Sequence, residues 1–153
     1  MLRKNIQRPA LEDEETPLWY YPIDFAIDFK SNSKATMYLI DYENNKNWLS
    51  TGIWKSENRG DDWTRMAQYT HPLSIEINPF HNNEIFVNGL WSVDGKWGDG
   101  GLFYSYDFGK TWKKNLKVPY QSNGRSSTID PSNPNKIFYT FFGNSLMYGP
   151  KPN

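Results

Sequence analysis

Four acidic side chains form the set from which this sequence could build a catalytic pair. Asp24 and Glu76 lie in β-type runs, while Asp94 and Asp99 lie in the loop 91–100, which reads WSVDGKWGDG. Two carboxyl groups that face each other across a cleft are the usual machinery for hydrolysing a glycosidic bond. Acids also serve in structural hydrogen-bond networks, and this alternative is favoured for any pair of the four.

A second group of side chains has the composition of a sugar-binding surface. Aromatic rings offer flat faces to the C–H side of a sugar ring, and planar polar groups bind its hydroxyls. The candidates are Tyr20, Tyr21, Trp48, His71, Trp91, Trp97 and Arg125. For any single one of the three tryptophans, packing of its loop onto the strands is the favoured alternative.

Composition excludes several other kinds of chemistry. Lys and Arg number 17, as do Asp and Glu, so the net charge of zero gives no basic footprint for nucleic acid or an anionic membrane. The absence of Cys excludes a thiol nucleophile and disulfides. Because His71 and His81 lack the spacing of a metal pair, we expect neither metal nor cofactor. The N-terminus is charged without an apolar stretch, which predicts no signal peptide and, for the chain as supplied, a cytoplasmic location.

Two turn motifs divide the chain and would position these candidates. The first consists of Ser105, Asp107, Gly109 and Trp112, and the second consists of Ser56, Asn58, Gly60 and Trp63. In each we expect the Ser and the Asp or Asn side chain to bind local backbone amides. The Gly then takes a positive φ, and the Trp folds back over the corner.

The spacing Ser-x-Asp-x-Gly-x-x-Trp resembles the Asp-box, or BNR, repeat. Proteins with this repeat are β-propellers such as sialidases, xyloglucanase-type glycosidases and sortilin-like receptors. The ending at 137–149 is most similar to the xyloglucanase type. The resemblance implies that these turns are structural corners and that ligands meet the opposite face. A sialidase would need three arginines on that face, and only Arg125 has a suitable place.

The landmarks of the repeat recur at a fixed period. Trp112 follows Trp63 by 49 positions (112 − 63), and Ile129 follows Ile77 by 52 (129 − 77) within matching Ile-Asn/Asp-Pro turns. Runs of β-branched and aromatic residues between these turns predict eleven strands in an all-β fold. The predicted strands are 23–29, 36–42, 52–56 and 63–67, then 73–77, 84–90, 101–105 and 111–116, then 126–129, 136–142 and 144–148.

This pattern predicts one half-propeller domain over residues 1–153. Blade 1 spans 23–69, blade 2 spans 70–120, and blade 3 spans 121–153 without its outer strand. Residues 1–9 match the outer strand of blade 2 in type, and an acidic linker, 10–22, follows them.

Three blades are fewer than the 4 to 8 of closed propellers. We therefore expect two chains to form a homodimeric six-bladed ring in which each N-terminal strand completes the partner's third blade. The alternative is a piece of a longer propeller.

Three functions are consistent with these observations. The first is a non-catalytic propeller that binds carbohydrate through its interblade loops and second-to-third-strand loops. The second is a glycosidase or a fragment of one, and the third is a protein-interaction scaffold. Oligosaccharide and a second copy are the partners expected, with no nucleic acid and no membrane.

Overall fold

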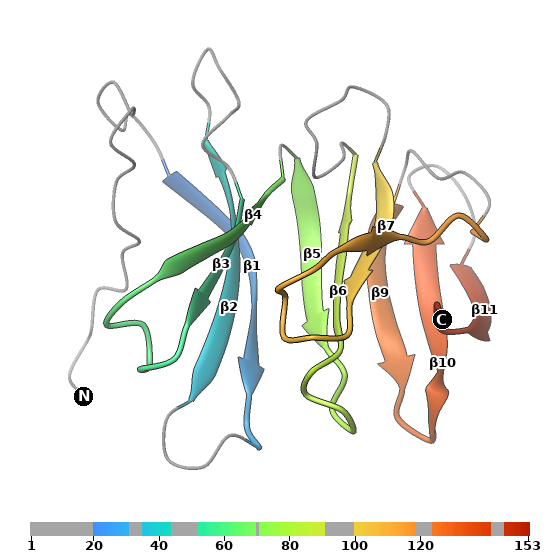
Figure 1. Ribbon diagram of the computed structural model, residues 1–153. Coiled ribbons are helices and arrows are strands. Elements are labelled where there is room, and N and C mark those ends of the chain that lie inside the picture. Colours follow the sequence, from blue (N-terminus) through green and yellow to red (C-terminus); the bar gives the residue numbers. More distant parts are fainter. Residues whose placement is uncertain are drawn as a thin grey trace.

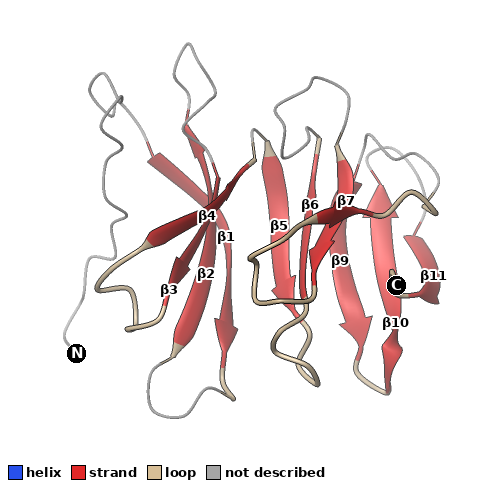
Figure 2. Ribbon diagram, viewed as in Figure 1, coloured by secondary structure: helices blue, strands red, loops and turns tan. Residues whose placement is uncertain are grey.

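The computed structural model describes residues 20–30, 35–43, 52–69, 71–90, 100–118, 124–141 and 146–153. Within them, every regular element is a strand, and the strands form three antiparallel sheets that stand in a row (Figures 1 and 2). The predicted all-β class is thereby confirmed.

The first two sheets have four strands each, in sequence order. The first contains β1 (Tyr20–Asp28), β2 (Thr36–Glu43), β3 (Gly52–Ser56) and β4 (Thr64–Gln68). The second contains β5 (Pro72–Ile77), β6 (Ile85–Gly89), β7 (Gly101–Ser105) and β8 (Lys113–Lys114). β1 begins at Tyr20 and so includes the last residues of the predicted linker, whereas β8 is shorter than the predicted strand 111–116.

The third sheet contains β9 (Gly124–Asp130), β10 (Asn133–Phe141) and β11 (Leu146–Pro150). Its strands lie in the order β11-β10-β9, with β9 nearest the second sheet (Figure 1). Within the described ranges, no strand pairs with the outer edge of β11. The predicted outer strand, residues 1–9, lies outside the described residues, so strand exchange stays a prediction.

Two hydrophobic layers hold the row of sheets together. Tyr38 and Ile40 of the first sheet pack against Ile85 and Val87 of the second. On its other face the second sheet contributes Phe86, Leu102 and Tyr104 to a layer with Ile129, Ile137, Tyr139 and Phe141 of the third. Alternate residues of a strand point to opposite faces, so the second sheet is buried on both sides and β6 is buried throughout.

The three sheets share one internal register, which the first turn of each sheet fixes. Asp28, Asn78 and Asp130 end the innermost strands, and each side chain accepts the amide two residues ahead at 2.8, 2.9 and 2.8 Å, respectively. In Asx-turns of this kind, one hydrogen bond from a backbone amide to the side chain stabilises the reversal of the chain. Counting back from these three residues identifies equivalent positions in the three sheets.

The two predicted turn motifs, the Ser56 turn (residues 56–63) and the Ser105 turn (residues 105–112), have the same geometry. Gly60 N–H donates to Ser56 Oγ at 2.8 Å, and Gly109 N–H donates to Ser105 Oγ at 2.9 Å. The two glycines have φ values of 82° and 84°, in the left-handed region that favours glycine. The ring of Trp112 lies beside Gly109, and Trp63 is buried in the other turn.

Asn58 and Asp107 perform equivalent roles in these turns. Asn58 Oδ1 accepts the amide of Asp62, and Asp107 Oδ1 accepts the amide of Thr111, both at 2.9 Å. Asp107 Oδ2 also accepts the Thr111 hydroxyl at 2.6 Å. These bonds stabilise the charged carboxylate, so the pKa of Asp107 falls to about 2.

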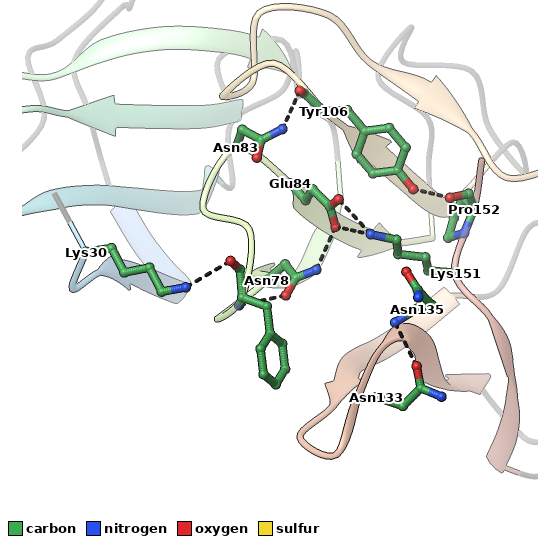
Figure 3. A network of polar contacts seen from close by, with 10 residues as sticks. Lys30, Asn78, Asn83, Glu84, Tyr106, Asn133, Asn135, Lys151 and Pro152 are labelled. Carbon is green, nitrogen blue, oxygen red and sulfur yellow. Dashed lines mark hydrogen bonds and ion pairs between the residues drawn. The ribbon is translucent and has the colours of Figure 1, made fainter.

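The C-terminal residues return from β11 to the second sheet (Figure 3). Lys151 Nζ lies 2.6 Å from both carboxylate oxygens of Glu84, which also accepts from Asn78 Nδ2 at 2.6 Å. The Tyr106 hydroxyl donates to the carbonyl of Pro152, and the Lys151 ammonium lies 5.6 Å from the Tyr106 ring centre. This group joins the residues that follow β11 to the second sheet, near the Asx-turn of Asn78.

Candidate functional site

The antiparallel topology separates the candidate residues from the two turn motifs. At one end, here called the loop end, lie the strand ends that the connections β2–β3, β4–β5, β6–β7 and β8–β9 join, toward the top of Figure 1. At the other, the turn end, lie the Ser56 and Ser105 turns and the Asx-turns. By its position in the sequence, every predicted ligand residue belongs to one of these strand ends or to a segment that joins two of them.

Asp24 lies on β1 and reaches across to the second sheet. Its Oδ2 accepts the amide of Ile75 at 3.0 Å, and its Oδ1 accepts the amide of Phe25 at 2.9 Å. One carboxylate therefore holds backbone groups of two neighbouring inner strands. Both of its oxygens accept backbone hydrogen bonds, and Oδ2 makes the link between the sheets.

Glu76 makes the corresponding contact between the second and third sheets. Its Oε1 accepts the amide of Ile129 at 3.0 Å and the hydroxyl of Thr128 at 2.8 Å. Burial raises the pKa of Glu76, the two hydrogen bonds oppose that rise, and the nearby charge of Asp24 adds to it. A raised pKa suits a general acid, but the geometry assigns the carboxylate to holding two sheets in register.

Glu76 also lines an open hollow of about 370 Å³ at the turn end of the first two sheets. The polar groups around this hollow are mutually bonded. Asn82 Nδ2 donates to Asp28 Oδ2 at 2.9 Å, and Lys30 Nζ donates to the carbonyl of Phe80 at 2.9 Å. These contacts tie the first Asx-turn to the second.

The other two candidate acids, Asp94 and Asp99, lie outside the described residues, as do Trp48, Trp91 and Trp97. Tyr20 and Tyr21 open β1 at the loop end, and the structure describes their backbone alone. For this part of the candidate site, the structure thus describes the backbone of the neighbouring strand ends.

His71 and Arg125 are the candidate ligand residues whose side chains are described. His71 precedes β5 and is half-buried, and burial lowers the pKa of its imidazole, which favours the neutral form. Arg125 lies on β9 and is exposed. They come from neighbouring sheets and the same end of the fold.

Close backbone packing fixes the loop end of the second sheet. A Cβ on Gly89 would lie 2.3 Å from the carbonyl oxygen of His71 and 2.5 Å from the Tyr69 ring. A Cβ on Gly124 would lie 2.3 Å from the Tyr139 hydroxyl. The residues that flank the candidate loops therefore have little freedom to move.

One polar cluster was not predicted from the sequence. Asn88, fully buried on β6, donates from Nδ2 to Ser74 Oγ at 3.1 Å and to Ser127 Oγ at 2.7 Å. An Asn within the apolar run Ile85–Gly89 was the signal that could have revealed it. Like Asp24 and Glu76, this cluster joins inner strands of adjacent sheets.

The described residues contain no group of acids or histidines arranged to hold a metal ion. In the same residues, no helix has the length and apolar character needed to cross a membrane.

Comparison with known proteins gives information on the fold. No family model matches the sequence, and no curated protein matches it. Among solved structures, a GH74 xyloglucanase from Xanthomonas campestris is similar, with a TM-score of 0.61 and 16% sequence identity. The chain has a propeller-type fold. The match covers 84% of this chain and 23% of the xyloglucanase chain, and at this identity it supports a distant relationship in fold alone.

Proposed function

We propose that this chain is a non-catalytic, propeller-type binding module whose ligands are carbohydrates. The observation that carries the proposal is the use of both inner-strand acids as links between sheets. Asp24 holds the amide of Ile75, and Glu76 holds the amide of Ile129. A glycosidase must keep two carboxyl groups available to the scissile bond, and these two are occupied.

The geometry of the Ser56 and Ser105 turns supports assignment to the Asp-box type of repeat. The Ser and Asp side chains are satisfied within each turn, by bonds such as Gly109 N–H to Ser105 Oγ at 2.9 Å. Self-contained corners of this kind offer few polar groups to a ligand. We therefore assign binding to the loop end.

The residue types at the loop end support carbohydrate as the ligand class. Trp48 belongs to the β2–β3 connection, and Trp91 and Trp97 belong to the β6–β7 connection, which also contains Asp94 and Asp99. Indole rings stack on the apolar faces of sugars, and carboxylates accept bonds from hydroxyl groups. The similarity to a xyloglucanase makes glucan-type oligosaccharides the first probe.

Titration of xyloglucan oligosaccharides and a glycan array against the purified chain tests the proposal. We expect binding without release of reducing ends, and we expect Trp91→Ala and Trp97→Ala to weaken it about tenfold or more. Phe80→Ala, which changes an exposed aromatic residue at the turn end, is the matched control and should leave affinity unchanged. No binding to any glycan, or equal affinity in all three variants, would contradict the proposal.

A glycosidase, or a fragment of one, is the second candidate because the similar structure is a xyloglucanase. Asp94 and Asp99 would then supply the carboxyl groups. Release of reducing ends that Asp94→Asn and Asp99→Asn both abolish, with unchanged stability, would replace the binding proposal with this one.

A further inference from the structure

The first sheet presents apolar side chains on the face that points away from the second sheet. Ala26 of β1 packs into the layer between these sheets, so its neighbour Phe25 lies on the opposite face. Phe25 is 59% exposed. Trp54, on the same face of β3, is buried, so the exposed apolar area is concentrated on the innermost strand.

The shared register identifies the residues of the other two sheets that are equivalent to Phe25, and their burial can be compared. Three residues before each Asx-turn residue stand Phe25, Ile75 and Ser127. Ile75 is 5% exposed and Ser127 is 7% exposed, because each packs against the preceding sheet. Phe25 therefore occupies an interface position without a preceding sheet among the described residues.

The third sheet presents the complementary face at the other end of the row (Figure 1). Ile137 and Tyr139 pack toward the second sheet, so Phe138 and its cross-strand partner Tyr148 face outward. Leu146 pairs with Thr140 on the same outward face and is 60% exposed. In the first two sheets, the positions equivalent to Phe138 are Tyr38 and Phe86, both fully buried against the next sheet.

We propose that the exposed face of β1 binds the outward face of the third sheet of a second copy of this chain. The contact repeats the one that already joins the first sheet to the second and the second to the third. It is head-to-tail, so it either closes a ring or continues into a filament. The inference goes beyond the proposed function and does not depend on any ligand.

The number of sheets determines the number of copies. Closed propellers typically have about 4 to 8 blades, and within this range six is the multiple of three. Two copies with three sheets each therefore close the ring, and both ends of each row become buried. The same closure would cover the outward face of β11.

At one position of the proposed contact, two uncharged residues would meet. At the position where Glu76 links two sheets, the third sheet has Thr128 and the first has Ala26. Contact between the third sheet and the partner's first sheet would therefore place Thr128 beside the Ala26 position, and neither residue carries a charge. At this position, no acid would face another acid across the new interface.

Light scattering after size-exclusion chromatography measures the assembly directly. We expect a mass of about 36 kDa, twice the 18.0 kDa of one chain. Phe25→Asp and Leu146→Asp should each raise the dissociation constant about tenfold or more, because each places a charge in the interface. Leu116→Asp is the control: Leu116 is 69% exposed and follows β8, which belongs to the middle sheet of the row, so the dimer should persist.

Mixing the two monomeric variants distinguishes head-to-tail contact from contact between identical faces. A Phe25→Asp chain keeps its outward third-sheet face, and a Leu146→Asp chain keeps its β1 face, so the mixture should regain 1:1 dimers through one intact interface. Circular dichroism should show that both variants are folded. A wild-type monomer, a filament, or variants that remain as dimeric as the wild type would overturn the proposal.

Discussion

Replacing Glu76 by Ala tests most directly whether it links the second and third sheets. The change removes both bonds to Oε1, from the Ile129 amide and the Thr128 hydroxyl. Each bond contributes about 1 kcal/mol net, and the half-buried amide left without an acceptor adds about 1 kcal/mol. Because burial already disfavours the charged carboxylate, the sum is an upper bound. We expect the free energy of unfolding to fall by about 2 to 3 kcal/mol.

Glu76→Gln is the matched variant, because an amide oxygen can accept the same two bonds. We expect it to change the stability by less than about 1 kcal/mol. Urea unfolding followed by tryptophan fluorescence measures both variants, and the Ala variant should also melt about 5–10 °C lower. Equal losses in the two variants would refute the reasoning. So would a stable Gln variant that had lost a glycosidase activity of the wild type.

The remaining predictions concern pH and two further contacts. The pKa of Glu76 in the folded protein lies above its ordinary 4.5, so the folded state binds more protons just above that pH. Stability should therefore fall as the pH rises from 4.5 through the folded pKa, and Glu76→Gln should remove this slope in urea titrations. Asp107→Ala should cost about 1 kcal/mol. Since the pKa of Asp107 is about 2, its contribution should disappear as the pH falls from 3.8 toward 2, and Asp107→Asn should not show this loss. Lys151→Met should cost about 1–3 kcal/mol by leaving the Glu84 carboxylate without its cation, and adding Glu84→Gln should restore part of the loss in the same assay.

Sequence alone could predict the turns and strands because their causes are local. The Ser105 turn needs a hydroxyl, a carboxylate and a glycine at fixed spacing, and its bonds span four residues or fewer. Alternating apolar residues placed the strands, with differences at their ends. β1 starts at Tyr20, before the predicted start at 23, because its pairing with β2 continues past a bulge at Pro22.

The roles of Asp24 and Glu76 could not be predicted in the same way. Their amide partners, Ile75 and Ile129, are more than fifty positions away in the sequence. Such a contact depends on which strand of the next sheet lies beside the acid and on how the two sheets are shifted along each other. Neither property produces a periodic pattern in the sequence. An acid on an inner strand is therefore consistent with both catalysis and structural linkage until the neighbouring strand is known.

The row of equivalent positions Ala26, Glu76 and Thr128 has a consequence for how such a chain can evolve. Propellers grow by duplication of blades, and a tandem copy of the second sheet would put a second Glu76 where Thr128 now donates at 2.8 Å. Two carboxylates at that distance cannot both be charged without a large penalty. Substitution at this position must accompany any duplication of the second sheet. Because each sheet carries a different residue at this position, the three sheets are not interchangeable.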